Sequence, residues 1–144
     1  MKIGIVSGYF NPVHIGHIRM LSAARTQCDH LIVIVNNDVQ QLLKKNKIIM
    51  EEYERAVVVR ELRTVDELFL SIDGDATVCK SLEHLAKINS CAEMIFFNGG
   101  DRQSIQDIPE TEVCQKYNIE MVFGCGGNTK VNSSSEINKR LGKE

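Results

Sequence analysis

The sequence predicts an α/β fold with a doubly wound, Rossmann-like, five-stranded parallel sheet and helices on both faces. Short apolar runs alternate with amphipathic stretches along its 144 residues. The run Leu31 to Val35 is apolar throughout, as in a central parallel strand buried on both faces. The chemically distinctive segments all follow predicted strands, where parallel sheets bind their ligands. We expect one domain over residues 1–144, with no repeat or linker.

The order of the elements follows from changes in apolar periodicity. Turn and cap residues set the limits: Asp38 suits the start of a helix, Asp73-Gly74-Asp75 is a turn, and Pro109 opens a helix. In chain order we predict a strand at 3–7, a helix at 16–27, a strand at 30–35, a short helix at 38–43, a basic loop at 44–50, a helix at 51–63, a strand at 67–72, a helix around 82–88, a strand at 94–97, a helix at 109–117, a strand at 119–123, a loop at 124–132 and a final helix.

Composition and charge exclude several classes of function. The net charge of −2 and the pI of about 6.1 give no positive field that would favour nucleic acid or a membrane surface. The apolar runs are too short to span a bilayer. Five cysteines without a Cys-x-x-Cys pair argue against a disulfide scaffold or a zinc ribbon. Reduced thiols and the lack of a predicted signal peptide favour a cytoplasmic location.

The most informative segment is Gly8 to His17, which reads Gly-Tyr-Phe-Asn-Pro-Val-His-Ile-Gly-His. It connects the first predicted strand to the start of a helix, where free N–H groups and a partial positive charge favour phosphates. His14 and His17 can share one face of the first helical turn. Gly8 and Gly16 leave room for a ligand over the backbone. The segment therefore indicates a site for a nucleoside triphosphate.

Other interpretations of this segment are weaker. A His-x-x-His pair can bind a metal, but no third ligand stands at a convincing spacing. The pair could also be incidental. The Gly-x-Gly-x-x-Gly pattern of dinucleotide-binding folds is missing, and so is the P-loop pattern.

The segment resembles the Gly-x-Phe-Asp-x-x-His-x-Gly-His signature of the nucleotidylyltransferase superfamily. It is most similar to the single-domain cytidylyltransferase-like branch, which includes glycerol-3-phosphate cytidylyltransferase. The adenylyltransferase half of the bacterial heptose-phosphate enzyme is also similar. Further family segments are matched in order by Arg55, Arg63-Thr64-Val65-Asp66-Glu67, Gly99-Gly100-Asp101 and Ser133-Ser134-Ser135-Glu136-Ile137.

Two positions depart from the family pattern. Asn11 stands where the family has Asp, so a hydrogen-bonding role survives there and a charge-dependent one is lost. The family's arginine upstream of the serines would fall near Asn128. Lys130 can replace its charge but not its two-pronged hydrogen bonding.

The resemblance implies attack of an acceptor phosphate on the α-phosphorus of a nucleoside triphosphate, with release of pyrophosphate. The attacking phosphate is already anionic, so positioning and charge neutralisation carry the catalysis. The resemblance assigns catalytic roles to His14, His17 and Lys44. It assigns nucleotide binding to Gly8, Tyr9, Phe10, Asn11, Gly16, Gly99, Asp101, Arg102, Ser133, Ser134 and Ser135, and acceptor binding to Lys47, Arg55, Arg63 and Lys130.

Several of these residues also have a purely structural interpretation. Ser133 and Glu136 form a capping-box pattern, and Asp101 can cap a helix or turn. The lysines of the 44–50 loop can be a solvated surface. Arg55 and Arg63, eight residues apart on the predicted helix, can pair with neighbouring glutamates.

The short single-domain build favours CTP as the nucleotide and a polyol or sugar phosphate, such as glycerol phosphate, as the acceptor. ATP is the alternative nucleotide, and a non-catalytic nucleotide-binding protein is the alternative function. Triphosphate chemistry implies Mg²⁺ held mainly by the phosphates. We expect a homodimer, and neither nucleic acid nor membrane as a partner.

Overall fold

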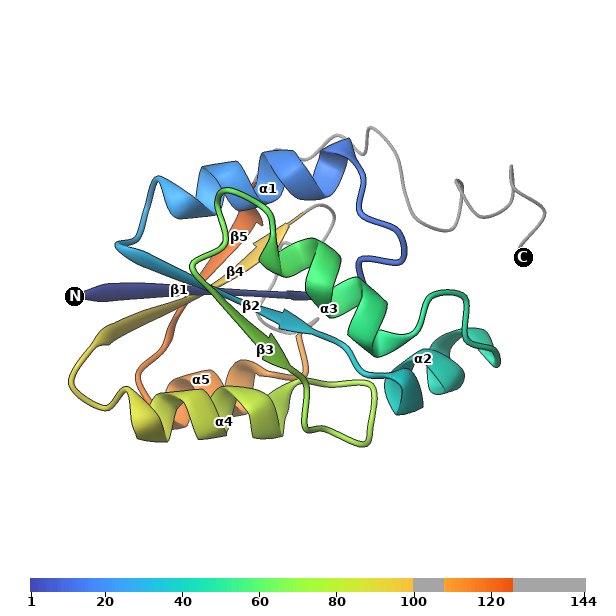
Figure 1. Ribbon diagram of the computed structural model, residues 1–144. Coiled ribbons are helices and arrows are strands. Elements are labelled where there is room, and N and C mark those ends of the chain that lie inside the picture. Colours follow the sequence, from blue (N-terminus) through green and yellow to red (C-terminus); the bar gives the residue numbers. More distant parts are fainter. Residues whose placement is uncertain (100–107, 126–144) are drawn as a thin grey trace.

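The computed structural model describes residues 1–99 and 108–125. In this part of the chain five parallel strands form one sheet in the order β3-β2-β1-β4-β5 (Figure 1). The strands are β1 (Lys2–Gly8), β2 (His30–Val35), β3 (Glu67–Leu70), β4 (Glu93–Gly99) and β5 (Glu120–Cys125). The helices are α1 (Ile15–Arg25), α2 (Asp38–Lys45), α3 (Glu52–Arg60), α4 (Cys79–Ile88) and α5 (Thr111–Lys116). The predicted fold class is confirmed.

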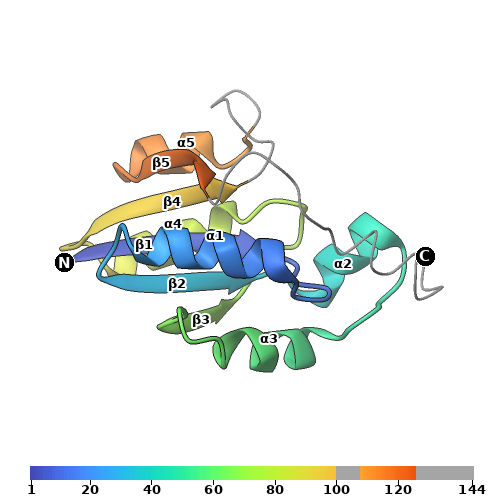
Figure 2. The ribbon, with the colours of Figure 1, turned by 90° about the horizontal axis from the view of Figure 1, so that it is seen from above.

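Helices cover both faces of the sheet, α1 and α3 on one and α4 and α5 on the other (Figures 1 and 2). Successive side chains of a strand point to opposite faces, so a central strand must be apolar at every position. In β1, Ile3 and Ile5 pack in the core on the α4–α5 face, and Val6 packs in the core on the α1–α3 face. The unbroken apolar run of β2 is divided between the two cores in the same way.

The strand order reverses beside β1. The chain first adds β2 and β3 on one side of β1 and then crosses to place β4 and β5 on the other. The carboxyl ends of the strands meet at the edge on the right of Figure 1. In open parallel sheets, ligands bind in the crevice outside those ends where the order reverses, here between β1 and β4.

Two helix boundaries differ from the prediction in ways that move site residues. Helix α2 continues to Lys45, so Lys44 lies in its last turn and not in a loop. Its cap is Asn37, whose side chain accepts from Gln40 N at 2.9 Å, because Asp38 is already the first helical residue. Helix α3 ends at Arg60, before Arg63. The final helix, expected after residue 132, lies outside the described residues.

None of the helices in residues 1–99 and 108–125 combines the length and the apolar character that a bilayer-spanning helix needs. The five cysteines are free thiols, of which Cys114 and Cys125 are buried and Cys91 is exposed.

Gly4 tests how tightly the α1–α3 core is packed. A Cβ at this position would lie 2.7 Å from Phe97 Cε2 and 2.8 Å from Cys28 Sγ. We therefore expect Gly4→Ala to lower the free energy of unfolding by about 1–3 kcal/mol in urea denaturation, as in other overpacked cores. Gly74→Ala is the control, because a Cβ at Gly74 would meet nothing within 4 Å. Equal stabilities of the two variants would contradict this packing.

Candidate functional site

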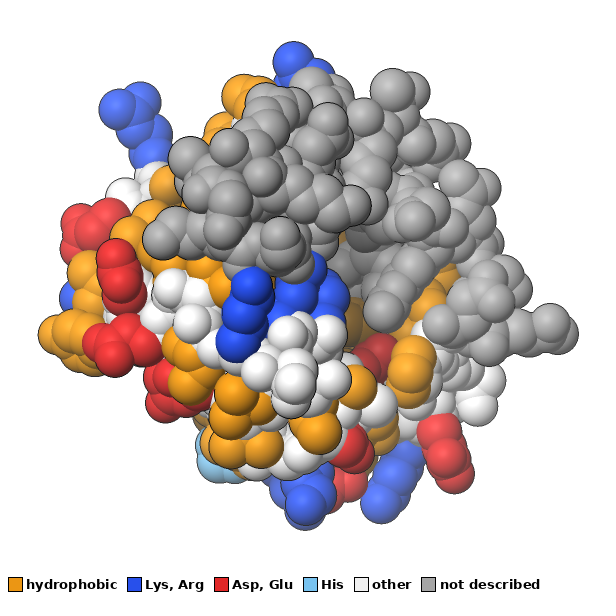
Figure 3. All heavy atoms as spheres, turned by 90° about the vertical axis from the view of Figure 1, so that its right-hand side faces the viewer, with side chains coloured by type: hydrophobic (Ala, Val, Ile, Leu, Met, Phe, Trp, Pro, Cys, Tyr) orange, Lys and Arg blue, Asp and Glu red, His pale blue; other side chains and the backbone are white. Residues whose placement is uncertain are grey.

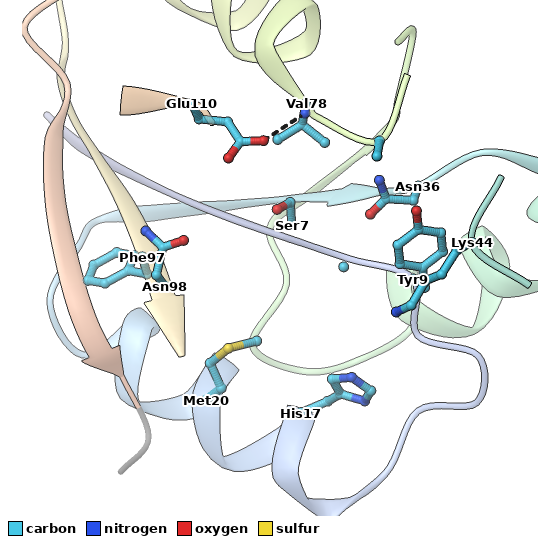
Figure 4. Close-up of a pocket in the computed structure, with 12 residues that line it drawn as sticks. Ser7, Tyr9, His17, Met20, Asn36, Lys44, Val78, Phe97, Asn98 and Glu110 are labelled. Carbon is cyan, nitrogen blue, oxygen red and sulfur yellow. Dashed lines mark hydrogen bonds between the residues drawn. The ribbon is translucent and has the colours of Figure 1, made fainter. Parts of the chain in front are cut away.

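A pocket with a volume of about 310 Å³ lies where the strand order reverses. Its floor comes from the ends of the two central strands: Ser7 and Gly8 of β1, and Phe97 and Asn98 of β4. The other lining residues are Tyr9, His17, Met20, Asn36, Lys44, Ala76, Val78 and Glu110 (Figure 4). On the face of the molecule that the strand ends point to, Lys and Arg side chains gather near the centre (Figure 3). Lys44 is one of the lining residues, so the site predicted after β1 includes a positively charged side chain.

His14 and His17 hold each other in place at the start of α1. His14 Nδ1 accepts a hydrogen bond from Gly16 N at 3.1 Å, and His17 Nδ1 accepts one from His14 N at 3.2 Å. This is a reciprocal cap of the kind that Ser and Glu usually make. The ring centroids lie 4.0 Å apart, so the predicted shared face is confirmed.

The capping bonds fix the tautomer of both rings. A ring nitrogen that accepts a hydrogen bond carries no hydrogen, so each neutral ring carries its hydrogen on Nε2. Burial, followed by the nearby His14 and Lys44, lowers the pKa of His17 from 6.5 to about 4. His17 is thus a neutral hydrogen-bond donor at physiological pH, and it lines the pocket.

Lys44 brings a positive charge to the same pocket from α2. Its Nζ lies 4.4 Å from the centroid of the Tyr9 ring, a cation–π contact. Tyr9 in turn donates from its hydroxyl to Gln40 O of the same helix at 3.4 Å. Burial raises the pKa of Tyr9, which keeps this hydroxyl protonated. The loop after β1 and helix α2 therefore form one side of the pocket together.

Phe10 does not have the position expected of a nucleotide-binding residue. Its side chain is 1% exposed and packs in the α1–α3 core, with its ring centroid 4.7 Å from that of His17. Its φ of 51° is in the left-handed region, which turns the chain sharply after β1. A Cβ on Gly8 would meet the Phe10 ring at 3.0 Å. Gly8 therefore makes room for this ring, whereas we expected it to make room for a ligand.

Asn11 is also occupied by the protein itself. Its side chain is 3% exposed; Nδ2 donates to Gln41 Oε1 at 2.6 Å, and Oδ1 accepts from Met50 N at 3.1 Å. An amide supplies both the donor and the acceptor that these contacts need, whereas an ionised carboxylate supplies no donor. The Asn at this position is thus explained by contacts within the chain.

Arg55 is not the surface or substrate-contacting residue that the sequence suggested. It is 0% exposed, although it lies on α3. Its guanidinium donates to four segments of the chain: to Met50 O at 2.8 Å, to Tyr9 O at 3.0 Å, to Asn36 O at 2.5 Å and to Asp38 Oδ1 at 3.0 Å. Arg55 therefore holds the walls of the pocket and does not line it.

Arg63 is not brought to the pocket. Helix α3 starts near the carboxyl ends of the strands and runs back toward their amino ends, and Arg63 lies exposed in the turn before β3. The expectation that Arg55 and Arg63 share one helix face is therefore wrong. In the matching family segment, Asp66 accepts from Leu31 N at 2.8 Å and pairs with Arg25 at 2.9 Å, so it anchors the start of β2.

The remaining predicted site residues divide into two groups. The first group is described by the structure but does not line the pocket. Lys47 is exposed just after α2, Gly16 lies in the first turn of α1, and Gly99 ends β4. The others lie outside the described residues and stay predictions: Asp101, Arg102, Lys130, Ser133, Ser134 and Ser135.

Eight of the residues that line the pocket were not among the predicted site residues: Ser7, Met20, Asn36, Ala76, Val78, Phe97, Asn98 and Glu110. Met20, Ala76 and Val78 are apolar and carry no signal. Asn98 is the last side chain of β4 before a Gly-Gly pair, and this position could have marked it. Glu110 stands at the start of the short helix α5, and only the packing of α5 beside α4 brings it to the pocket. No group of three His, Cys, Asp or Glu side chains within the described ranges is placed to hold a metal ion.

The comparisons with known proteins agree with this geometry. A sequence model of the family described as cytidylyltransferase-like matches residues 5–141. The chain belongs to this family. The matched span includes the paired histidines, the α2 lysines, the second half of β1 and the whole of the other four described strands.

Curated relatives and solved structures support the membership. Bifunctional protein HldE of Hyphomonas neptunium is 33% identical over 145 residues, which cover 96% of this chain and 28% of that protein. HldE of Rhodopseudomonas palustris strain BisA53 is 40% identical over 102 residues, covering 69% of this chain and 19% of that protein. The chain thus spans less than a third of the length of these relatives.

A crystal structure of the lipopolysaccharide core biosynthesis protein from Thermoplasma volcanium matches with a TM-score of 0.64 and 25% identity, over 92% of this chain and 99% of that one. A putative nicotinate-nucleotide adenylyltransferase from Vibrio parahaemolyticus has a TM-score of 0.67 at 18% identity, over 99% of this chain and 89% of that one, which supports the fold alone. None of these four proteins is a glycerol-3-phosphate cytidylyltransferase, the member that the sequence alone favoured.

The role of Arg55 can be tested by stability. Arg55→Ala empties a fully buried side-chain site and takes the donor away from three backbone carbonyls, so we expect it to cost about 3–5 kcal/mol in the free energy of unfolding. Arg60→Ala is the matched control, because Arg60 is exposed on the same helix, and its cost should stay below about 0.5 kcal/mol. Urea denaturation measures both. Equal costs for the two variants would show that Arg55 does not hold the pocket walls.

The lowered pKa of His17 predicts how stability depends on pH. The folded chain binds a proton to His17 only near pH 4, and the unfolded chain does so near pH 6.5. The contribution is therefore complete above about pH 6.5 and is lost as the pH falls toward 4, by at most about 3 kcal/mol. His17→Asn keeps an acceptor at the Nδ1 position but does not titrate. Urea denaturation should show a shallower fall for this variant over that range; identical slopes would contradict the shifted pKa.

Proposed function

We propose that the chain is a nucleotidyltransferase that moves a nucleoside monophosphate from a nucleoside triphosphate to a small phosphorylated acceptor and releases pyrophosphate. The observation that carries this proposal is the neutral His17 in the same pocket as Lys44, at the reversal of strand order. Family membership supports the same reaction class.

The pocket suits a reaction that needs no general base. A phosphate monoester is already anionic at neutral pH, so the protein has to align it with the α-phosphorus and to neutralise the charge that develops on the pyrophosphate. The Nε2–H groups of the His pair can donate to those oxygens, and Lys44 supplies a positive charge. His17 has no tendency to take up a proton at neutral pH, so it stays a donor.

We infer that ATP is a better candidate than CTP, and a sugar phosphate a better candidate than glycerol phosphate. The support comes from the resemblance to the adenylyltransferase half of the heptose-phosphate enzyme, together with relatives named HldE and a lipopolysaccharide core biosynthesis protein. This reverses the preference for CTP that the short chain suggested.

We propose that Mg²⁺ enters with the triphosphate and is held mainly by phosphate oxygens. Its chemistry there is the neutralisation of negative charge. The chain's own contribution is the cationic and N–H-rich side of the pocket. We also propose a homodimer, which light scattering tests: a mass near 16.2 kDa, that of one chain, would contradict it.

The test is pyrophosphate release with Mg²⁺, ATP or CTP, and a panel of phosphorylated acceptors. We expect release that depends on both substrates and is faster with ATP and a sugar phosphate. His17→Asn keeps the helix cap but lacks a donor at the Nε2 position, so its rate should fall about a hundredfold, as for other oxyanion donors.

His17→Gln is the matched control, because its amide reaches closer to the Nε2 position; it should lose less activity than the Asn variant. Tight nucleotide binding without release for any pair would indicate a non-catalytic binding protein. Full activity of His17→Asn would contradict the mechanism.

A further inference from the structure

Two buried polar atoms of the pocket have no hydrogen-bond partner within the described part of the chain. They are Asn98 Nδ2, a donor, and Glu110 Oε1, an acceptor. Asn98 is 6% exposed and Glu110 is 4% exposed, so water does not readily satisfy them. Unsatisfied buried polar groups destabilise a fold and are rare in native proteins. Both residues line the pocket, which indicates that a ligand supplies the missing partners.

The carboxylate of Glu110 is held in a fixed orientation. Its Oε2 accepts from Val78 N at 3.0 Å, at the start of α4, and this bond leaves Oε1 as the second acceptor (Figure 4). Val78 lines the pocket as well. A backbone N–H, and not another side chain, therefore holds the Oε1 atom of Glu110 in position as a hydrogen-bond acceptor.

The two ends of the pocket differ in charge. In Figure 4, Glu110 and Val78 lie across the pocket from His17 and Met20, and Asn98 lies along one edge. Lys44 and His17 favour a phosphate at their end. A buried carboxylate repels a phosphate, so the Glu110 end needs an uncharged group that can donate a hydrogen bond.

A hydroxyl group meets both requirements, because it donates to a carboxylate and accepts from an amide. A ligand that fits the whole pocket has a phosphate at one end and hydroxyls at the other. The volume of about 310 Å³ is at the small end for ligand pockets. It suits one sugar-sized group beside the reacting phosphates at the His17 and Lys44 end, with the nucleoside outside this volume.

We propose that Glu110 and Asn98 form a hydroxyl-recognition subsite that selects a polyhydroxylated sugar or polyol phosphate as the acceptor. This inference rests on the proposed nucleotidyl transfer and names its acceptor class. The ribose of the nucleotide carries the same hydroxyl chemistry, so the experiment has to distinguish the two sources.

The experiment compares acceptors that differ only in their hydroxyls. Mannose 1-phosphate is paired with cyclohexyl phosphate, and glycerol 3-phosphate with n-propyl phosphate. In Glu110→Gln the amide oxygen still accepts the hydrogen bond from Val78 N, but an amide N–H replaces the carboxylate oxygen Oε1. We expect its kcat/KM for the hydroxylated acceptors to fall roughly tenfold to a hundredfold, the loss of one hydrogen bond to a charged group. The values for the alkyl phosphates and the KM for ATP should stay within twofold.

Two further variants make the result specific. Asn98→Asp replaces the hydrogen-bond donor by a carboxylate oxygen. It should lower kcat/KM selectively for the same hydroxylated substrates. Glu112→Gln is the control, because Glu112 is exposed on α5 and outside the pocket lining; it should change nothing. The thermal midpoint of Glu110→Gln should not fall, because the variant removes an unsatisfied buried carboxylate.

Three outcomes would overturn the subsite. One is an equal loss with hydroxylated and alkyl acceptors together with a lower thermal midpoint, which would make Glu110 structural. Another is a raised KM for ATP, which would assign the pair to the ribose. The third is an unchanged acceptor preference in Glu110→Gln.

Calorimetric binding of mannose 1-phosphate and cyclohexyl phosphate separates this inference from the proposed function. If the wild-type chain releases no pyrophosphate with any pair, the transferase proposal fails. A preference for mannose 1-phosphate that Glu110→Gln abolishes would then still support the subsite, and equal binding of the two probes would refute it.

Discussion

The buried guanidinium of Arg55 is the interaction on which the pocket depends. A charge removed from water is tolerated only when hydrogen bonds and a counter-charge surround it. Arg55 meets this condition by bonding to the loop after β1, the end of β2, the first residue of α2 and the segment before α3. The sheet determines where the strands end, and the hydrogen bonds of Arg55 fix the conformation of the segments that follow β1 and β2. The positions of Tyr9 and Lys44 follow from it.

Much of the fold could be predicted because period-two and period-3.6 patterns are local properties of the chain. The β2 strand was predicted at its observed limits, since a strand buried on both faces is apolar at each position. The His pair could be predicted as well, because neighbouring positions in the first turn of a helix must face the same side. The sequence did not predict that both rings also cap α1, because Ser and Glu, and seldom His, form such a cap.

The failures concern residues whose surroundings come from distant parts of the chain. Nothing in the sequence near Arg55 says that its helix turns it inward, because the acceptors lie on segments separated from it by up to 46 residues. Arg63 was misplaced by an error in the end of a helix. Glu110 reaches the pocket only through the packing of α5, and Phe10 enters the core only through its left-handed backbone. Such positions depend on topology and not on periodicity.

The direction of β1 has a consequence for how this fold is combined with others. The amino end of β1 and the pocket are at opposite edges of the sheet, about a strand length apart (Figure 1). A module fused ahead of Met1 would emerge at the amino ends of the strands, away from the pocket (Figure 1). A fusion at the amino end would therefore leave the pocket residues in place, since the joint and the pocket lie at opposite edges of the sheet.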